Sequence, residues 1–445
     1  MAALDGLTVL DLPRVLGGPY CTMLLADMGA DVVKVEPPSG DPVRETPPFA
    51  GDPETDPYGG YFQSVNRGKQ SLALDLTDED DRAALLDLVD RADVLVENYR
   101  PGTMERFGLG YERLAERNPG LVYAAIRGFG DPRTGATDHQ DQPTFDLVVQ
   151  AMSGVMQVNG QPEDPPTKVG LGVGDIFTGV CSAVGILAAV YHRDRTGEGQ
   201  FVDTSMYDSM LSLSERAIYQ YSYTGEVPGR DGNSHPTLFP YDAFETTDGL
   251  VVIAAIGERH WTALCEAMGR PDLAAYETQA ARLERRDELT AAIESWTSEH
   301  TSEDVLGALE GDVPSAPVRD VADVFADGVA ADRGMLVDLD QPGADEPVTV
   351  AGTPVAMTAT PPNPGGRAPL LDEHRETLLG DAPGAGDGVE RKGEAGDGSA
   401  DPGESDSTPG PTGASGAVES DPSPESVESD GASGTAESDS SASSD

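Results

Sequence analysis

Asp175 is the residue whose type and position best suit chemistry in this chain. It lies between glycines at positions 170, 172 and 174 and the apolar run that begins at Ile176. Glycine removes side-chain bulk, so backbone or substrate can come close to the carboxylate. The start of a helix also supplies free N–H groups and partial positive charge, which favour an ionised and nucleophilic aspartate. Because Asp is a preferred N-cap residue, a purely structural capping role fits the same spacing.

The elements that must position Asp175 alternate between strand and helix over residues 1–200. Strand-like runs are LTVLDL, DVVKVEP, SLALDL, DVLVEN, LVYAAIRG and QFVDTSMYD, and helices are predicted over PYCTMLLADMGA and DEDDRAALLDLVDRA. Crossover helices between such strands predict a mostly parallel, Rossmann-like α/β sheet. The first strand is followed by RVLGGPY, which lacks the GxGxxG fingerprint, so a nicotinamide-dependent oxidoreductase is disfavoured.

The later segments predict a smaller domain inserted into the larger one. Residues 1–200 form the first part of the large domain, and residues 201–237 are a linker helix followed by a loop rich in glycine and proline. Residues 238–315 predict a small α+β domain, and residues 316–380 return to the large domain. The large domain is therefore expected to be built from both ends of the chain.

The last segment has a different composition. Residues 381–445 carry 16 acidic and 2 basic residues and contain no aromatic residue, leucine or isoleucine. Such a segment cannot bury enough apolar surface to offset its chain entropy. It is predicted to be a disordered acidic tail.

The surface charge indicates the salt concentration to which the protein is adapted more than it indicates a function. The formal net charge is −50, from 79 acidic and 29 basic residues, and lysine occurs at only four positions: 34, 69, 168 and 392. This balance excludes sequence-independent binding to nucleic acid and disfavours anionic membranes. It is typical of proteins adapted to molar salt, where the short Debye length screens self-repulsion.

Motifs for metals, secretion and membranes are missing. The three cysteines are widely spaced and the six histidines are scattered, so no ligand spacing for a metal is present. The amino terminus lacks a basic region followed by an apolar one, and no uninterrupted apolar run reaches the roughly 20 residues of a membrane span. The sequence predicts a halophilic, soluble, cytoplasmic protein.

Several separated motifs, in this order and spacing, resemble the class III CoA-transferases. This family includes formyl-CoA transferase, carnitine CoA-transferase and α-methylacyl-CoA racemase. The resemblance runs from about Leu4 to Leu379 and rests on LDGLTVLDL, GGPYCTMLLADMGADVVKVEPPSGD, NRGKQSLALDL, DVLVENYRPGTMERFGLGYE, FDLVVQAMSGVM, VGDIFTGVCSAVGILAAVYHRDRTGEGQFVDTSMYD and RDGNSHP. It implies a homodimer of two interlocked chains that uses coenzyme A esters as substrates and holds no permanently bound cofactor.

The resemblance also implies that Asp175 is the catalytic nucleophile, because it matches the aspartate of the family's GD motif. In family transferases this aspartate attacks the acyl-CoA thioester and forms an acyl-aspartyl anhydride and CoA thiolate. The thiolate then gives an aspartyl-CoA thioester, and the acceptor acid takes the CoA through a second anhydride. Anhydride and thioester are close in reactivity, so one difficult exchange becomes several balanced ones.

The resemblance implies CoA contacts at positions that match the family. These are Val15, Gly17, Leu74, Asn98 and Tyr99 along the adenine and pantetheine path, and Arg106 near the phosphates. Two positions depart from the oxalate-linked transferase, which has Gln where this chain has Leu16 and Arg where it has Pro38. Arg14 or Arg44 is expected to supply the missing positive charge.

Phe145 and Asp146 separate transferase from racemase. In the racemase branch a His followed by Asp stands at this point and supplies one of the two bases. Phenylalanine cannot take up a proton, so the pair here favours a transferase. Asp146 is expected either to orient substrate or to cap the helix that follows it.

The loop RDGNSHP aligns with the glycine-rich flap of the oxalate-linked transferase. It contains Gly232 and Asn233 on the substrate side but no run of glycines, which argues against formyl or oxalate chemistry. Succinyl-CoA as donor and mesaconate or a related dicarboxylate as acceptor are expected from family and habitat. The alternatives are an α-methylacyl-CoA racemase and a non-catalytic CoA-binding protein, and the presence of Asp175 counts against the latter.

Overall fold

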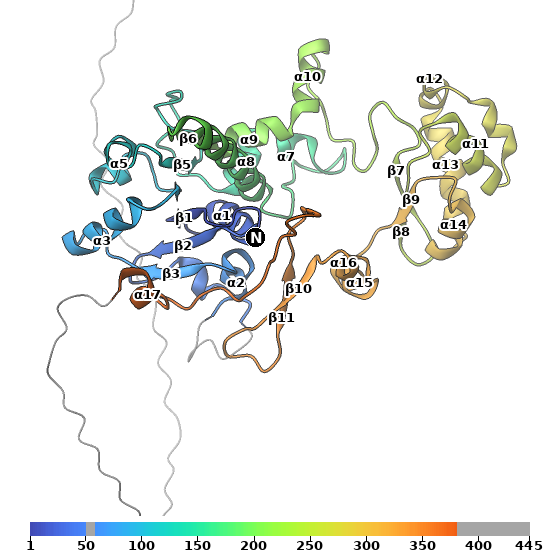
Figure 1. Cartoon of the computed structure of the whole chain (residues 1–445). Coiled ribbons are helices and arrows are strands. Elements are labelled where there is room, and N and C mark those ends of the chain that lie inside the picture. Colours follow the sequence, from blue (N-terminus) through green and yellow to red (C-terminus); the bar gives the residue numbers. More distant parts are fainter. Residues whose placement is uncertain (50–57, 381–445) are drawn as a thin grey trace, which may run out of the picture. The chain divides into compact units, whose positions relative to one another are not determined.

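The computed structural model describes residues 1–49 and 58–380; the predicted acidic tail, 381–445, lies outside the described residues. Its largest element is a six-stranded parallel sheet with the order β3-β2-β1-β4-β5-β6 (Figure 1). The strands are β1 (Thr8–Asp11), β2 (Asp31–Glu36), β3 (Gln70–Ala73), β4 (Val94–Glu97), β5 (Val122–Arg127) and β6 (Phe201–Ser205). This order is typical of Rossmann-like sheets, so the predicted α/β class is confirmed.

Helices cover both faces of the sheet. Successive residues of each strand point to opposite faces, so every strand contributes side chains to both helical layers. Val9 faces a cluster that includes α1 (Gly17–Asp27) and α8 (Val173–Thr196). Its neighbour Leu10 faces a second cluster that includes α3 (Glu79–Val89) and α5 (Tyr111–Arg117). Burial on both faces explains why β4 and β5 read as apolar runs without alternation.

The central helix α8 packs closely against α1. A methyl group on Gly179 would lie 2.6 Å from the backbone oxygen of Gly17, so glycine is required at this crossing. By length and composition α8 also suits a membrane span, although the sequence has no uninterrupted run of that length. Its residues Ala183 and Ile186 lie in the same buried cluster as β1 and β4. This is the packing of a core helix.

Shorter elements connect these layers and carry the loops around the sheet. They are the 3-10 helix η1 (Pro42–Glu45), α2 (Gly60–Asn66), α4 (Thr103–Arg106), α6 (Asp146–Met152) and α7 (Val155–Val158). The linker helix predicted within residues 201–237 forms two helices, α9 (Met206–Leu213) and α10 (Glu215–Thr224). They are separated at Ser214, whose φ and ψ of −87° and 18° leave the helical region.

Residues 239–313 have a hydrophobic cluster of their own. It lies against a three-stranded antiparallel sheet of the order β7-β8-β9, made of β7 (Asp242–Glu245), β8 (Leu250–Ile253) and β9 (Ser315–Pro317). The accompanying helices are α11 (Glu258–Ala267), η2 (Pro271–Ala275), α12 (Gln279–Leu283), α13 (Arg286–Thr297) and α14 (Ser302–Leu309). Trp261 is fully buried in this cluster and donates from its indole nitrogen to the Leu273 oxygen at 3.1 Å.

The carboxyl-terminal part of the described chain returns to the first sheet. It comprises α15 (Val321–Ala326), α16 (Val329–Asp332), the antiparallel pair β10 (Leu336–Leu339) and β11 (Val348–Ala351), and α17 (Arg375–Leu379). The Ala73 amide donates to Asp372 at 2.8 Å, and the Ser71 amide donates to His374 at 3.2 Å. These bonds fasten the segment before α17 along β3.

Candidate active site

A cavity of about 490 Å³ opens at the carboxyl ends of β1, β4 and β5. β1 is bonded to β2 on one side and to β4 on the other, so the strand order reverses at this point. Ligands of open α/β sheets bind in the crevice at such a switch point. The predicted site residues that line this cavity are Val15, Gly17, Asn98, Tyr99, Phe145 and Asp175.

Asn98 joins the loop after β4 to the loop after β1. Its Oδ1 accepts from the Arg14 amide at 3.0 Å, and its Nδ2 donates to the Arg14 oxygen at 2.8 Å. The next residue, Val15, has a φ of 74°, which is a strained conformation for a β-branched side chain. Asn98 therefore fixes one wall of the cavity in addition to any contact with a ligand.

Asp175 lies in the first turn of α8, as the third residue of that helix. The N-cap is Gly172, and no side chain caps this helix by the usual bond. Asp175 is therefore not the N-cap of α8, although the sequence allowed that role. A methyl group on Gly17 would approach the Asp175 backbone oxygen to 3.1 Å and its Oδ1 to 3.2 Å, so any larger residue would press on the carboxylate and displace it by a few tenths of an ångström.

The charge of Asp175 is less favoured than the helix start alone predicts. Burial, followed by the nearby carboxylate of Asp146, raises its pKa to about 6, and the Gly17 backbone acts in the opposite direction. The carboxylate is still mostly ionised at pH 7. Because it is partly stripped of water, it is a better nucleophile than an exposed aspartate.

Asp146 binds the start of α8 instead of capping its own helix. Its Oδ1 accepts from the Gly174 amide at 2.7 Å, and its Oδ2 accepts from Gln150 at 2.7 Å. The residue before it, Phe145, is the N-cap position of α6 and is 69% exposed at the cavity. The prediction that Asp146 caps the following helix is wrong, because its side chain reaches a helix start that is 28 residues away.

The glycines before Asp175 serve different purposes. A methyl group on Gly172 would lie 2.8 Å from the Leu16 side chain, and one on Gly174 would lie 2.9 Å from Val149 and 3.0 Å from Asp146. A methyl group on Gly170 would meet nothing within 4 Å. Close approach therefore explains the second and third glycines and not the first.

Comparison with known proteins identifies the family to which this chain belongs. Residues 4–375 match CoA-transferase family III. The chain belongs to this family. A succinyl-CoA:mesaconate CoA-transferase from Haloarcula hispanica is 64% identical over 88% of this chain and 99% of its own length. An acetyl-CoA:oxalate CoA-transferase from Acetobacter aceti is 41% identical over 84% of this chain and 94% of its own length.

A solved structure agrees with the sequence relatives. The crystal structure of a CaiB/BaiF family protein from Brucella suis has a TM-score of 0.75 and 36% identity, over 85% of this chain and 99% of that one. The predicted family and the predicted enzyme class are confirmed. The organism of the first relative also agrees with the halophilic composition.

A CoA-transferase must hold the phosphates of its substrate, and three arginines line the cavity: Arg14, Arg100 and Arg127. Arg127 forms ion pairs with Glu97 and Asp131, which leaves Arg14 and Arg100 for the phosphates. The Arg14 guanidinium lies 5.2 Å from the centre of the Tyr99 ring. Arg44, the other expected source of charge, instead forms two hydrogen bonds to Glu36 at 2.8 and 2.7 Å. Arg14 is therefore better placed than Arg44 to bind the phosphates of CoA.

Five predicted residues do not line the cavity: Asp146, described above, and Leu74, Arg106, Gly232 and Asn233. Leu74 is 1% exposed and packs in the hydrophobic cluster under α3, so its side chain faces the core. Arg106 is exposed beside the cavity, and its Nη2 donates to Thr103 at 3.1 Å. Gly232 donates its amide to the Gly160 oxygen at 3.1 Å, and its neighbour Asn233 is exposed.

Two residues of the cavity escaped the sequence prediction. Arg100 lies within the motif DVLVENYRPGTMERFGLGYE but was not singled out, and Gln142 lies in none of the motifs. Tyr61, which lines a different cavity, was also missed; burial, followed by the charge of Asp175, raises its pKa to about 12. The position of Tyr61 directly after a pair of glycines, at the start of α2, is the only local signal for it.

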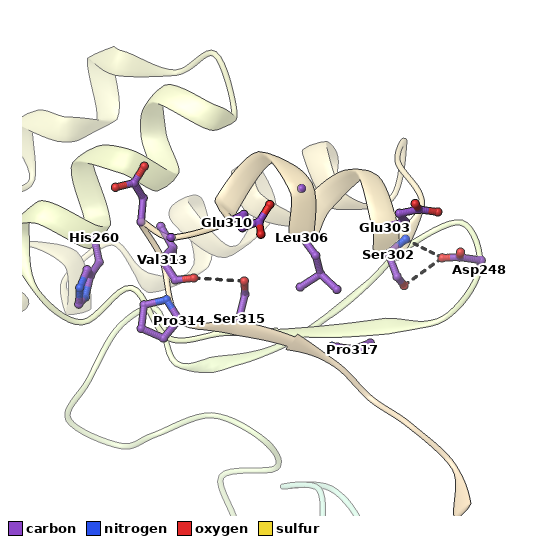
Figure 2. Close-up of a pocket in the computed structure, with 13 residues that line it drawn as sticks. Asp248, His260, Ser302, Glu303, Leu306, Glu310, Val313, Pro314, Ser315 and Pro317 are labelled. Atoms are coloured by element: carbon purple, nitrogen blue, oxygen red, sulfur yellow. Dashed lines mark hydrogen bonds between the residues drawn. The ribbon is translucent and has the colours of Figure 1, made fainter. Parts of the chain in front are cut away.

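A larger cavity lies elsewhere and does not contain these groups. It has a volume of about 1020 Å³ and is lined by Asp248, by residues of α11, α14 and β9, and by the segment between α14 and β9 (Figure 2). Asp248 there accepts from the Ser302 amide at 2.8 Å and from its hydroxyl at 3.0 Å, so these polar groups satisfy one another. Among residues 1–49 and 58–380 no group of His, Cys, Asp and Glu could hold a metal ion. Size alone therefore does not identify the active site.

Proposed function

We propose that the chain transfers CoA from succinyl-CoA to mesaconate. The observation that carries this is the partly buried carboxylate of Asp175 in the switch-point cavity, together with the 64% identity to a succinyl-CoA:mesaconate CoA-transferase. Because substrate choice within a family depends on the residues around the cavity, identity at this level over 99% of the relative supports the same donor and acceptor.

The reaction divides into four exchanges at a carbonyl carbon. An Asp175 oxygen attacks the donor thioester, the C–S bond breaks, and CoA leaves as thiolate. The thiolate attacks the aspartyl carbonyl of the resulting anhydride, which releases succinate and leaves an aspartyl-CoA thioester. The acceptor carboxylate then displaces the thiolate, and the thiolate attacks the acceptor carbonyl of the second anhydride. Asp175 is regenerated, and no net proton is gained or lost.

The surroundings of Asp175 suit these steps. Gly17 lies against Asp175 and its backbone acts to lower the pKa of that carboxyl, so the Gly17 amide would donate to the oxygen that develops negative charge when the aspartyl carbonyl is attacked. Arg14 and Arg100 would bind the phosphates of CoA. Val15, Tyr99 and Asn98 would line the path of the adenine and pantetheine, with Arg106 at its rim.

The racemase alternative has less support. Phe145 stands where that branch has its histidine, and no histidine is among the described residues that line the cavity. His139 lies nearby and contacts Gln142 at 3.1 Å, so it is the residue to test if a base is needed. A non-catalytic CoA-binding protein would not need a nucleophile in this position.

An isotope experiment separates the two activities. A single enantiomer of a 2-methylacyl-CoA is incubated in D2O with the purified protein in molar salt, without an acceptor acid. A transferase gives slow deuterium uptake next to the thioester, and a new CoA ester appears when succinyl-CoA and mesaconate are supplied together, with parallel double-reciprocal lines. Fast uptake without an acceptor would instead identify a racemase, and His139→Ala would then test the base.

The interlocked homodimer belongs to the same proposal. Several large apolar side chains are exposed on the single chain along α8 and α10, including Val184 and Tyr191 at 64% each and Tyr223 at 89%. A second copy would cover such a surface. Light scattering in 2 M salt would test it, with a mass of about twice 46.6 kDa expected.

The predicted domain boundaries and location stay proposals as well. The separate hydrophobic cluster of residues 239–313 supports a small domain, and β9 (Ser315–Pro317) extends it across the predicted boundary at residue 315. The packing of α8 in the core supports a soluble enzyme that acts in the cytoplasm. Neither nucleic acid nor a membrane has a role in this proposal.

A further inference from the structure

The chain has only four lysines, and the structure buries two of them completely beside the active site. Nearly all other positive charges of this chain are arginines. An ammonium group is compact and carries three donors, so it fits a narrow site where a planar guanidinium does not. Lysine retained in such an arginine-rich chain therefore marks two positions at which that geometry is needed.

The two lysines hold the two ends of the loop that follows β1. Lys34 donates to the Pro13 oxygen at 2.9 Å, and Lys69 donates to the Pro19 oxygen at 2.9 Å. Lys69 uses its other donors on Asp11 at 2.7 Å and Asn66 at 2.9 Å. Both ends of the segment 13–19 are thus fixed by side chains that have no exposed surface.

The middle of the same loop is held by the partner of Lys34. Asp41 lies 3.0 Å from the Lys34 ammonium and accepts from the Val15 amide at 3.2 Å. Val15 has a φ of 74°, a conformation that an L-residue keeps only where its surroundings enforce it. Asp41 supplies that restraint, and the strained turn brings Gly17 opposite Asp175.

We propose that this set, the lysine clamp, positions the loop of residues 13–19 against the nucleophile. The lysine clamp consists of Lys34, Lys69, Asp11 and Asp41. None of its members lines the cavity, so they act through the loop and are positioning residues. The inference rests on the proposed function, in which the Gly17 amide serves the carbonyl chemistry of Asp175.

The energetics of buried ion pairs make this role separable from stability. Replacing both members of a buried pair by apolar residues of similar volume is often neutral or stabilising, since no charge has to be desolvated. The double substitution Lys34→Met/Asp41→Leu is therefore expected to fold. It removes the partners of the Pro13 oxygen and the Val15 amide, so the loop loses its restraints while the core stays packed.

The chain offers a matched control pair. Arg67 and Asp27 are also buried, with side chains 1% exposed and a 2.7 Å contact. Arg67 donates to the Ala351 oxygen at 2.9 Å, so this pair fastens the carboxyl-terminal segment and not the loop. The control variant is Arg67→Met/Asp27→Leu.

The experiment compares kcat, KM and amide hydrogen exchange of residues 13–19 for the two variants and the wild type in molar salt. We expect Lys34→Met/Asp41→Leu to lower kcat about 100-fold with KM for succinyl-CoA within about threefold, because a displacement of about 1 Å at a reacting group has this effect. Exchange at the Val15 and Gly17 amides is expected to accelerate. The control is expected to keep kcat within about twofold and the loop protected.

Each outcome decides one of the two ideas. A folded clamp variant with wild-type kcat and unchanged protection of the loop would overturn the clamp, and so would an equal loss of kcat in the control. If the double variant does not fold, Asp41→Asn, which keeps the side-chain shape, decides by the same readouts. Absence of an aspartyl hydroxamate at position 175 after the wild type is incubated with succinyl-CoA and hydroxylamine would instead refute the proposed function, and the exchange data would still test the clamp.

Discussion

The start of α3 and the lysine clamp both contain several carboxylates, which are exposed to solvent in the first region and buried in the second. The sequence TDEDD at α3 puts Asp78, Glu79 and Asp80 in solvent, where Asp78 only caps the helix through the Asp80 and Asp81 amides. Beneath the cavity, Asp11 and Asp41 have no exposed surface and each meets a lysine. Carboxylates therefore interact mainly with water in the first region and form fixed ion pairs with lysines in the second.

The difference shows which charge interactions depend on the salt concentration. Exposed carboxylates interact through water, where an ionic strength of 1 M shortens the Debye length to about 3 Å. Buried pairs are screened far less because no ions enter between them. Salt should therefore control the overall stability of this protein, while the local geometry around Asp175 is set by contacts that salt does not reach.

Exchanging one carboxylate in each region gives the largest expected contrast. Asp175→Asn should lower the rate of CoA transfer by about 10⁴-fold or more, because an amide cannot form the anhydride. Asp80→Asn on α3 is the matched surface control and should leave the rate unchanged. Transfer is measured by mass spectrometry of the CoA esters, and an Asp175→Asn protein that retains about a tenth of the wild-type rate would exclude the covalent mechanism.

Removing salt tests the exposed charges. The net charge of −50 repels across the whole molecule once screening is lost, so the protein should loosen or unfold below roughly 0.5 M salt and recover above it. Melting temperature and mass are followed from 0.1 to 3 M potassium chloride. Full activity with an unchanged melting temperature in dilute buffer would contradict the assignment of the surface charge to salt adaptation.

The pH profile tests the buried carboxylate. With the pKa of Asp175 raised to about 6, the reactive ionised form falls about tenfold for each pH unit below this value and is nearly complete above pH 7. The plot of log kcat/KM against pH should bend near pH 6, at a fixed molar salt concentration. A bend near pH 4 would mean that burial and Asp146 do not act on the nucleophile.

The same pKa predicts the sign of a stability change. A carboxyl whose pKa is raised by folding binds its proton more tightly in the folded state, so its ionised form costs stability at pH 7 and nothing below the unfolded value of 3.8. Asp175→Asn should raise the melting temperature by a few degrees at pH 7 and leave it unchanged at pH 3.5. This gain together with a loss of activity is expected of a strained catalytic group.

Truncation after Gly380 has the smallest expected effect. Residues 381–445 contain no aromatic residue, leucine or isoleucine that could pack, so their removal should change neither the specific activity nor the melting temperature. Scanning calorimetry and the transfer assay on the 1–380 protein test this. A loss of several degrees would assign a structural role to these residues.

Local pattern was sufficient for the elements and for singling out Asp175. Strand-forming runs marked all six strands of the first sheet, and those of β4 and β5 are mostly apolar because these strands are buried on both faces. The GD motif before an apolar run marked Asp175, because both the motif and the helix start lie within a few residues of it. The break at Ser214 was missed, since the sequence around it remains compatible with a helix.

Contacts between distant residues could not be obtained in this way. Asp146 was expected either to orient substrate or to cap the helix that follows it, and its side chain instead accepts from the Gly174 amide in the first turn of α8. Leu74 matched a CoA position in the family pattern, yet its side chain points into the core because β3 pairs with β2 in one register only. A shift of one residue would have turned it to the other face.

The sequence by itself determined the family, the class of fold and the salt-adapted surface, and it predicted Asp175 as the nucleophile, since each depends on composition or on motifs read along the chain. The tertiary structure decided the order β3-β2-β1-β4-β5-β6, which brings the loops after β1, β4 and β5 to one cavity. It also decided that Lys34 and Lys69 hold the loop beside Asp175. Lys34 lies 21 residues from Pro13, and Lys69 lies 50 residues from Pro19. A local pattern carries no information about such distances, because only strand pairing and core packing fix them.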